Sequence, residues 1–196
     1  MSRLNFIPEQ TDELKEWHKK LGVKFFKEIG VQQGDYVFDF GCGSGTYTLP
    51  AAEVVGSKGK VFAIDVEQVC IDEIKDSLIT NQLKEIVVPI KTDGGFSFPI
   101  ESNSIDFALF VDVIGVIIHH KKSLKAIEDL FLEIVRLLKS SGIVAILFKH
   151  VRQWRHYKNE VDLIISKNFS LIKQLDIRHI HWDYFENDLI YLYKKK

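Results

Sequence analysis

The sequence has few cysteines and no long apolar run, and these absences exclude several classes of protein. Cys42 and Cys70 are the only cysteines among 196 residues, too few for a disulfide framework, and neither belongs to a metal-ligand pair. No stretch of about 18 apolar residues occurs, so we expect no membrane span. Met1–Gln10 holds no apolar stretch of the signal-peptide kind. We therefore expect a cytoplasmic protein without a metal site.

The chain also lacks an excess of charge of either sign. It has 26 Lys and Arg residues against 27 Asp and Glu residues, a formal net charge of -1. A dedicated nucleic-acid-binding domain is normally basic overall, so the balance argues against nucleic acid as a partner. The hydrophobic content of 46% is enough for a core, and the length suits one domain of about 100–200 residues. We expect a single domain over residues 1–196.

Apolar, β-rich runs alternate with helical patterns along most of the chain. This alternation predicts an α/β fold with a parallel sheet and crossover helices, and the unbroken apolar runs indicate strands covered on both faces. The expected strands are Tyr36–Phe40, Lys60–Asp65, Ile86–Lys91, Ile105–Val111 and Gly142–Lys149. The expected helices are Thr46–Val55, Glu67–Asn81 and Ser123–Lys139, the last with apolar residues at helical spacing.

The end of the chain departs from this alternation. After a helix near Glu160–Lys167 come two β-like runs, Phe169–Arg178 and Asp188–Tyr193, with no helix between them. So short a connection can join only antiparallel strands. We therefore expect the sheet to end in an antiparallel hairpin.

Three glycines at alternate positions follow the first expected strand. At Gly41, Gly43 and Gly45 the chain lacks Cβ atoms, so it can turn tightly and bring backbone N–H groups against a ligand. A loop at the carboxyl end of such a sheet is where open α/β folds bind nucleotides. A dinucleotide fingerprint needs a glycine at position 46, which is Thr46, and this argues against a dinucleotide-dependent oxidoreductase. A plain tight turn before a helix is the other alternative.

An acid two positions before the glycines changes the expected ligand. With Asp39, the pattern acid-x-Gly-x-Gly-x-Gly resembles the cofactor motif of class I S-adenosylmethionine methyltransferases. A carboxylate suits a ligand that carries an ammonium group and a sulfonium, and it would repel a pyrophosphate. The resemblance implies that Asp39, Gly41, Cys42, Gly43 and Gly45 bind this cofactor.

The resemblance continues along the chain. Asp65 ends the second expected strand, where the family places an acid that takes both ribose hydroxyls, and Val66 follows at the position against the adenine face. Asp93 and Gly94 follow the third strand, where relatives set an Asp near the adenine amino group. Asp112 ends the fourth strand, where family members contact cofactor and acceptor. These five residues complete the implied cofactor site.

Two longer segments resemble small-molecule methyltransferases, the quinone-ring and sterol-type enzymes most of all. Residues 96–106 look like their LPFPDNSFD stretch, and residues 134–142 look like their RVLKPGG turn. The resemblance implies a Rossmann-like three-layer sandwich with a seven-stranded mixed sheet of order 3-2-1-4-5-7-6 and an antiparallel C-terminal hairpin. It also implies a catalytic core over residues 34–196, with residues 1–30 as a helical lid or cap.

The sequence offers few candidate residues on the acceptor side of the site. Methyl transfer from a sulfonium is a direct displacement, so positioning and exclusion of water can supply much of the rate without a strong base. Asp112 can accept a proton or hold a cationic amine, or it can merely bond nearby backbone N–H groups. His119 and His120 follow in a loop, where either solvent or a substrate can face His119. The sequence assigns no catalytic residue, and Asp112 and His119 are the candidates.

Three segments are left to cover an acceptor pocket: residues 1–29, 112–122 and 149–158. Pro8–Ile29 is amphipathic, either as a helix packed on the sheet or as a lid that exposes Trp17 and His18 to the substrate. We expect a compact, partly aromatic pocket, to which these segments bring Trp17, His119, Trp154 and Tyr157.

Lys149–Lys158 is the one basic and aromatic cluster of the sequence. Its Lys149, Arg152 and Arg155 favour an anionic acceptor, although the segment can also grip RNA or be a solvated helix. We expect S-adenosylmethionine-dependent methyl transfer to a small-molecule acceptor. The alternatives are an RNA methyltransferase and a non-catalytic binding subunit with the same fold. The sequence does not tell the oligomeric state or the methylated atom.

Overall fold

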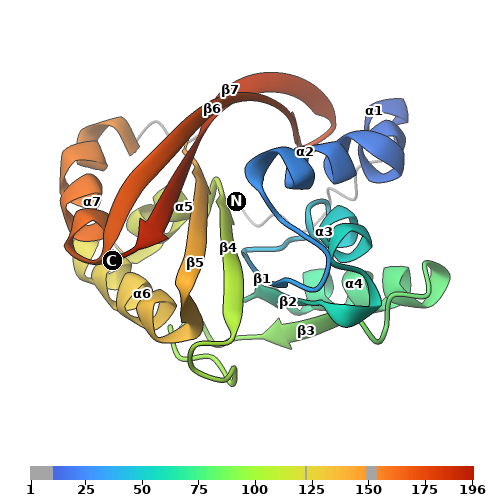
Figure 1. Ribbon diagram of the computed structural model, residues 1–196, viewed down its shortest axis with the longest axis horizontal. Coiled ribbons are helices and arrows are strands. Elements are labelled where there is room, and N and C mark those ends of the chain that lie inside the picture. The colour runs from blue at the N-terminus through green and yellow to red at the C-terminus, as the bar shows by residue number, and fades with distance from the viewer. Residues whose placement is uncertain (1–10, 122, 149–153) are drawn as a thin grey trace.

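The computed structural model describes residues 11–121, 123–148 and 154–196, except for the side chains of residues 154–156. Its strands form one seven-stranded sheet of order β3-β2-β1-β4-β5-β7-β6 (Figure 1). Strands β1 to β5 are parallel, and β7 runs antiparallel to both β5 and β6. The predicted strand order and C-terminal hairpin are confirmed. The strands are β1 (Tyr36–Phe40), β2 (Lys60–Asp65), β3 (Val87–Lys91), β4 (Ile105–Val111), β5 (Leu138–Leu147), β6 (Phe169–His181) and β7 (Tyr184–Lys195).

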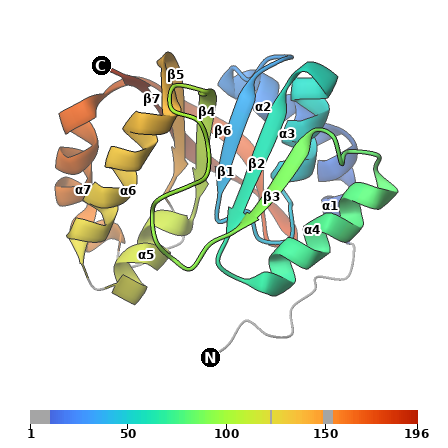
Figure 2. The same cartoon turned by 90° about the horizontal axis from the view of Figure 1, so that it is seen from below.

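Helices cover both faces of the sheet and complete the predicted three-layer sandwich (Figure 2). One face carries α1 (Asp12–Glu16), the π-helical turn η1 (Trp17–Leu21), α2 (Gly22–Ile29), α3 (Thr48–Val55), the short 3-10 turn η2 (Gly56–Lys58) and α4 (Gln68–Thr80). The other face carries α5 (Val113–Lys121), α6 (Leu124–Leu137) and α7 (Trp154–Asn168).

The central strands are apolar on both sides because alternate residues enter two separate cores. Val37 of β1 and Leu109 of β4 pack with the α1–α4 side. Phe38 and Phe110, one position further along each strand, pack with the α5–α7 side. Side chains alternate across a strand with a period of two, so a strand buried on both faces reads as an unbroken apolar run. The bounds predicted for β1, β2 and β4 agree with the structure.

The prediction of a loop over residues 112–122 is wrong for most of that segment. Val113–Lys121 forms α5, in which Ile114, Ile117 and Ile118 are buried against the core under α6. Their spacing of three and four residues is the helical one. The same segment also holds the two histidines and a lysine, which obscured its apolar face in the sequence.

The C-terminal hairpin is longer than predicted and continues beyond the sheet. The pairing between β5 and β7 ends at Leu147↔Ile190, whereas β6 and β7 stay paired to His181↔Tyr184. Residues 176–189 of the hairpin lie beyond the pairing of β7 with β5. We call this part of the hairpin the arm. Because Leu147 is the last residue of β5, the arm projects past the carboxyl edge of the parallel sheet. Figure 1 shows it curving over toward α1 and α2.

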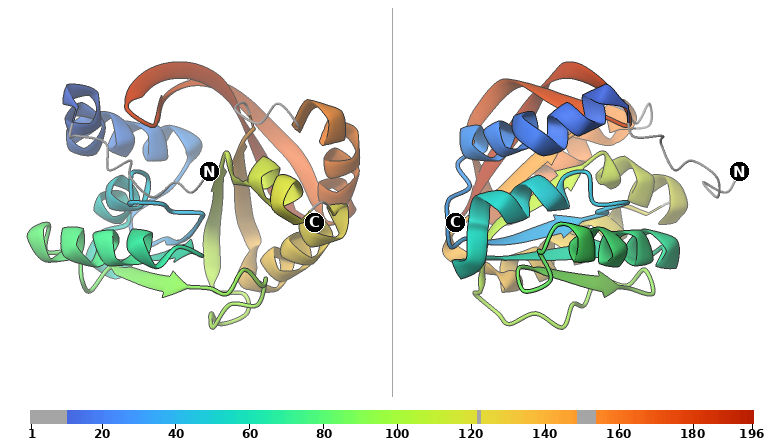
Figure 3. Two further views of the ribbon diagram at one scale, coloured as in Figure 1. Left: turned by 180° about the vertical axis from the view of Figure 1, so that it is seen from behind. Right: turned by 90° about the vertical axis from the view of Figure 1, so that its right-hand side faces the viewer.

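The N-terminal helices support the arm from the side of α3. Ile177 and Ile180 of the arm belong to the same core cluster as Phe25 of α2. At the tip, Thr11 Oγ1 donates a hydrogen bond of 3.5 Å to the carbonyl oxygen of Asp183. Figure 3 shows α1 and α2 running alongside the hairpin in both views. The arm is therefore held at its base by the sheet and along its length by these helices.

Within the described ranges, no helix is long and apolar enough to cross a membrane. In the same part of the chain, no three His, Cys, Asp or Glu side chains gather as the ligands of a metal ion would.

Candidate cofactor and acceptor site

The glycine loop, residues 41–45, joins β1 to α3 at the carboxyl edge of the sheet. The N–H groups of Gly41 and Cys42 both donate to the carbonyl oxygen of Ile64, at 2.8 and 3.0 Å, and Gly45 N–H donates to Cys42 O at 3.0 Å. These three donors have partners within the protein. The sequence led us to expect N–H groups turned toward a ligand, and for these three that expectation is wrong.

The three glycines serve different purposes. All have positive φ, at 76°, 53° and 93° for Gly41, Gly43 and Gly45, a region that other residues rarely adopt. A Cβ at Gly41 would lie 2.8 Å from Val113 Cγ2, and one at Gly45 would lie 3.1 Å from Ile74 Cγ1. These two glycines let α5 and α4 pack against the loop. A Cβ at Gly43 would meet no heavy atom of the described residues within 4 Å, so the loop is open there.

Asp39 is a buried acid of β1, two residues before the glycine loop. Its side chain accepts a 2.6 Å hydrogen bond at Oδ2 from Thr48 Oγ1, at the start of α3. Burial raises the pKa of this carboxyl to about 7, the Thr48 hydrogen bond opposes the rise, and the charge of Asp65 adds to it. Since an opposite charge nearby favours ionisation, a cation bound here would hold Asp39 in its charged form. Burial also raises the pKa of the neighbouring Cys42 thiol, which stays protonated.

Asp65, at the end of β2, anchors the glycine loop. Its Oδ2 accepts from Gly43 N–H at 2.9 Å, and its Oδ1 accepts from Glu67 N–H at 2.9 Å, just before α4. Each carboxylate oxygen has two lone pairs, so both oxygens keep the capacity to accept a further hydrogen bond. The next residue, Val66, is 49% exposed. An apolar surface therefore lies open beside a carboxylate that can still accept donors.

The turn after β3 lies across from Val66. Gly94 has a φ of 88°, and a Cβ there would lie 3.9 Å from Val66 Cγ1 and 3.6 Å from Lys121 Nζ of α5. The carboxylate of Asp93 accepts from Gly95 N–H at 2.8 Å and remains exposed. A cavity of about 530 Å³ opens beside this turn. The structure thus brings Asp65–Val66 and Asp93–Gly94 to one edge, as the motif positions implied.

Asp112 lies at the end of β4 and contacts a residue that the sequence did not point to. Its Oδ2 is 3.0 Å from Nδ1 of His181, in the arm. The side chains are 21% and 12% exposed respectively. Because a carboxylate only accepts hydrogen bonds, His181 donates from Nδ1. His181 lies beyond the predicted β-like run Phe169–Arg178, so nothing in the sequence places it beside Asp112.

The arm is tied to the start of α3 through Tyr47. The Tyr47 hydroxyl donates to the carbonyl oxygen of Ile180 at 2.8 Å and lies 3.0 Å from Nδ1 of His179. His179 is 1% exposed, and burial lowers the pKa of its imidazole. Its Nε2 is 3.4 Å from a carboxylate oxygen of Glu186, on the facing strand. His179 is therefore a buried structural histidine.

The hypothesis that Trp17 faces a substrate is wrong. Trp17 is fully buried, its ring centroid lies 5.1 Å from that of Tyr47, and its Nε1 donates to the carbonyl oxygen of Thr46 at 2.8 Å. The amphipathic stretch is thus packed on the core at this position. His18 is partly buried, and burial lowers the pKa of its ring.

The other residues expected around the acceptor are not brought together. His119 is exposed near the end of α5, about two helical turns from Asp112, roughly 10 Å along the helix axis. Tyr157 is exposed on α7. Lys149 and Arg152 lie outside the described residues, as do the side chains of Trp154 and Arg155. The expected pocket therefore lacks Trp17, and the basic cluster stays a prediction.

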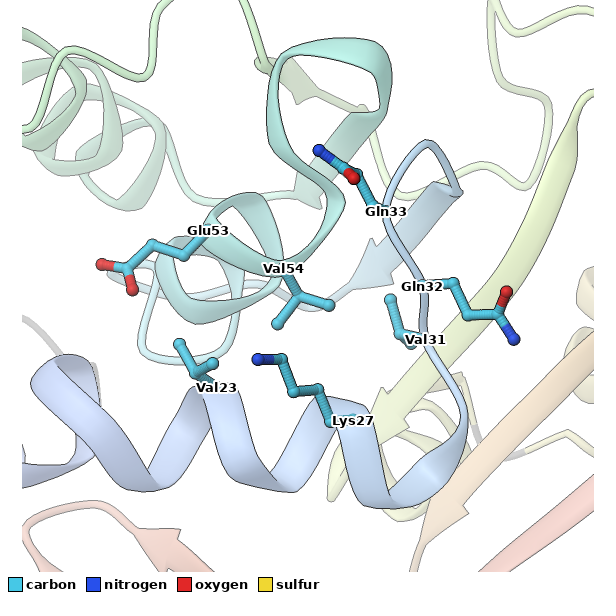
Figure 4. A pocket seen from close by; sticks show the side chains of 7 residues that line it. All are labelled: Val23, Lys27, Val31, Gln32, Gln33, Glu53 and Val54. Atoms are coloured by element: carbon cyan, nitrogen blue, oxygen red, sulfur yellow. The ribbon is translucent and has the colours of Figure 1, made fainter.

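A second cavity, of about 500 Å³, lies between α2 and α3 (Figure 4). It is lined by Val23, Lys27, Val31, Gln32, Gln33, Glu53 and Val54. Gln32 and Gln33 precede β1, and Glu53 lies near the end of α3. This cavity is therefore at the amino edge of β1, opposite the glycine loop, and does not belong to the site.

The comparison with known families agrees with the motif positions. The family model described as "Methyltransferase domain" matches residues 37–142, more than half of the chain. The chain belongs to this family. The match confirms the predicted methyltransferase family, and the structural neighbours below confirm the predicted fold.

Two curated relatives are each 30% identical to the chain over the aligned residues. It is 30% identical over 131 residues to the demethylmenaquinone methyltransferase of Lactobacillus johnsonii, covering 67% of this chain and 49% of the relative. It is 30% identical over 124 residues to the aklanonic acid methyltransferase DauC of a Streptomyces species, covering 57% and 56%. The chain spans about half the length of these relatives.

Solved structures share the fold at lower sequence identity. A methyltransferase from Aquifex aeolicus, described as SAM dependent, superposes with a TM-score of 0.67 at 20% identity over 92% of both chains. The [4+2]-cyclase SpnF superposes with a TM-score of 0.63 at 16% identity, over 88% of this chain and 81% of its own. A fold that also carries a cyclase does not specify the reaction, which has to be argued from the site.

Proposed function

We propose that this chain transfers a methyl group from S-adenosylmethionine to a small-molecule acceptor by direct displacement. The observation that carries the proposal is Asp39, a buried acid of β1 with its pKa raised to about 7, two residues before the glycine loop. Burying a carboxylate is costly unless a cation or hydrogen bonds compensate it. The ammonium group of the cofactor's methionyl end is such a cation.

The residues around Asp39 fit the rest of the cofactor. The remaining lone pairs of Asp65 can accept the two ribose hydroxyls, and the exposed side chain of Val66 offers an apolar surface for the adenine face. Asp93 and Gly94 lie on the far side of Val66, within reach of the adenine edge. We assign cofactor binding to Asp39, Gly41, Cys42, Gly43, Gly45, Asp65, Val66, Asp93, Gly94 and Asp112.

When bound, S-adenosylmethionine supplies an electrophilic methyl group on a sulfonium. The chain's own part is to hold donor and acceptor in line and to keep water away. The arm covers the carboxyl edge next to Asp112, where its His181 and Tyr184 rings lie 5.5 Å apart. In this proposal residues 34–196 are the catalytic core and residues 1–30 are a helical lid or cap, of which the described helices α1 and α2 support the arm.

A small molecule is favoured over RNA as the acceptor. The two relatives named above are a demethylmenaquinone and an aklanonic acid methyltransferase, so the acceptors in their names are small molecules. The net charge of -1 also gives no general attraction for a polyanion. The basic segment around Lys149, Arg152 and Arg155 favours an anionic small molecule.

Methyl incorporation from labelled S-adenosylmethionine tests the acceptor class. We expect label in the small-molecule fraction of a metabolite extract and none in total RNA assayed in parallel. Incorporation into RNA that is lost on replacing Arg152 and Arg155, and that falls steeply with salt through counterion release, would instead establish the RNA methyltransferase alternative.

A further inference from the structure

His181 and Asp112 form a pair beside the glycine loop, at the carboxyl edge of the sheet. Strands β1 and β4 are neighbours, with Phe40 opposite Phe110, so the glycine loop and Asp112 leave the sheet side by side. The packing of Val113 against Gly41 confirms how close the two segments are. His181 joins them from the arm, with Nδ1 at 3.0 Å from Asp112 Oδ2.

Asp112 is fixed by its backbone as well as by this contact. Its N–H donates to the carbonyl oxygen of Leu147, the last residue of β5, at 3.1 Å. Its φ is 55°, in the left-handed region that costs a residue with a side chain energy to occupy. Strained residues of this kind persist where the surrounding structure holds them, and functional sites are common among such places.

The position of His181 is equally determined. The neighbouring Ile180 carbonyl accepts the hydrogen bond from Tyr47, and the reversal at Trp182, with a φ of 58°, directs the chain back into β7. The rings of Trp182 and Tyr184 lie 5.9 and 5.5 Å from the His181 ring. The imidazole is thus oriented by aromatic neighbours on its own hairpin and by a carboxylate on β4.

We propose that His181, oriented by Asp112, removes the proton of the methyl acceptor, and that the acceptor therefore reacts through an ionisable hydroxyl group of a phenol or enol. This inference rests on the proposed methyl transfer. With Nδ1 donating to the Asp112 carboxylate, the neutral imidazole has its basic lone pair at Nε2. A histidine held in this way by a carboxylate is the arrangement of a general base.

The step balances in protons and electrons. The acceptor hydroxyl gives its proton to His181 Nε2, and the electron pair left on oxygen forms the new bond to the methyl carbon. The bond between that carbon and sulfur breaks, and its electron pair neutralises the sulfonium. The imidazolium is stabilised by the Asp112 carboxylate until its proton passes to water.

The other described histidines of this region do not match the role as well. His179 is buried and bonded to Tyr47, whereas His119 is exposed two helical turns from Asp112. A hydroxyl acceptor also requires a base to remove its proton. A neutral amine can attack the methyl group first and lose its proton afterwards.

The test compares wild type with His181→Ala and Asp112→Asn, and uses His120→Ala, an exposed histidine of α5, as the matched control. The probes are substituted phenols of graded acidity, an enolic 1,3-diketone and primary amines of similar size, each assayed with labelled S-adenosylmethionine. Asparagine tolerates the left-handed backbone at position 112, so Asp112→Asn removes the charge without adding strain.

We expect wild type and His120→Ala to methylate the hydroxyl compounds and not the amines. His181→Ala lowers kcat about 100-fold or more, the usual contribution of a general base, and leaves the Kd for S-adenosylhomocysteine unchanged. The loss shrinks as the phenol becomes more acidic, because an ionised phenol needs no base. A purely structural histidine would instead lower kcat by the same factor for every phenol.

Three results would overturn the inference: unchanged kcat in His181→Ala, a loss independent of phenol acidity, or wild-type methylation of amines or of none of the hydroxyl compounds. The proposed function is tested separately, by the binding of S-adenosylhomocysteine to the wild-type protein. If S-adenosylhomocysteine does not bind to the wild-type protein, the proposed function itself fails.

Discussion

The N–H group of Gly43 donates to Asp65 Oδ2 at 2.9 Å, which joins the open position of the glycine loop to the acid at the end of β2. The carboxylate that the motif assigns to the ribose hydroxyls therefore also holds the loop in shape. Cofactor binding and loop geometry depend on the same side chain. This double role determines what removal of Asp65 should do.

Asp65→Ala should weaken S-adenosylhomocysteine binding by about 1.5–3 kcal/mol, the loss expected for hydrogen bonds to a charged group. The variant should fold, with a lower Tm because two backbone N–H groups lose their acceptor. Asp72→Ala, which changes an exposed acid of α4, is the control and should change neither quantity. An unchanged Kd in Asp65→Ala would remove Asp65 from the cofactor site.

Asp39→Asn should stabilise the free protein above pH 7 and weaken cofactor binding. The pKa of Asp39 is raised from 3.8 to about 7 in the folded protein, so the native state holds a proton that the unfolded chain releases. The stability from this group is complete below pH 3.8 and is lost as pH rises to about 7.

Denaturant unfolding of both proteins from pH 4 to pH 9 measures this effect. The free energy of unfolding of the variant, relative to that of wild type, should increase with pH up to about pH 7, by on the order of a few kcal/mol. Above that pH the difference should stay constant. In calorimetry, wild-type affinity for S-adenosylhomocysteine should fall below about pH 7, because binding the ammonium requires ionised Asp39. Equal pH dependence in both proteins would contradict the assignment.

Alanine at the glycines should separate packing from ligand access. Gly41→Ala places a Cβ 2.8 Å from Val113 Cγ2 in a left-handed backbone, and we expect a loss of stability of about 2–4 kcal/mol. Gly43→Ala meets no described atom within 4 Å, so it should cost only about 1–2 kcal/mol of backbone strain. Because we propose that the cofactor binds at this open position, the Kd of Gly43→Ala for S-adenosylhomocysteine should rise at least tenfold. The opposite ranking of the two effects would place the cofactor elsewhere.

Tyr47→Phe should loosen the arm. It removes the hydroxyl that donates to Ile180 O, and leaving that buried carbonyl without its donor costs about 1–3 kcal/mol. Amide hydrogen exchange should become faster in residues 176–189 than in β4. Tyr157→Phe, at an exposed position of α7, is the control. Uniform exchange changes across the sheet would show that Tyr47 stabilises the whole fold rather than the arm.

The central strands could be predicted from sequence because their signal is local. Tyr36–Phe38 and Phe107–Val111 are unbroken apolar runs, as expected for strands buried on both faces. The acids at the strand ends followed from their positions after these runs. Cofactor residues such as Asp39 and Asp65 could therefore be predicted from the sequence alone.

The acceptor side depends on contacts between distant parts of the chain. His181 lies 69 residues from Asp112, and the two meet only because β6 and β7 stay paired beyond β5. The exposed residues at the ends of this hairpin gave no apolar alternation from which its length could be predicted. Trp17 was misassigned for a related reason, since its burial depends on Tyr47 and Phe25, whose positions periodicity alone does not give.

Titration calorimetry of the intact protein with S-adenosylhomocysteine and, separately, with NADH tests the central claim most directly. The account predicts measurable heat and one site for S-adenosylhomocysteine, a higher Tm in its presence, and no binding of NADH. Binding of NADH, with neither heat nor a Tm shift from millimolar S-adenosylhomocysteine, would contradict it.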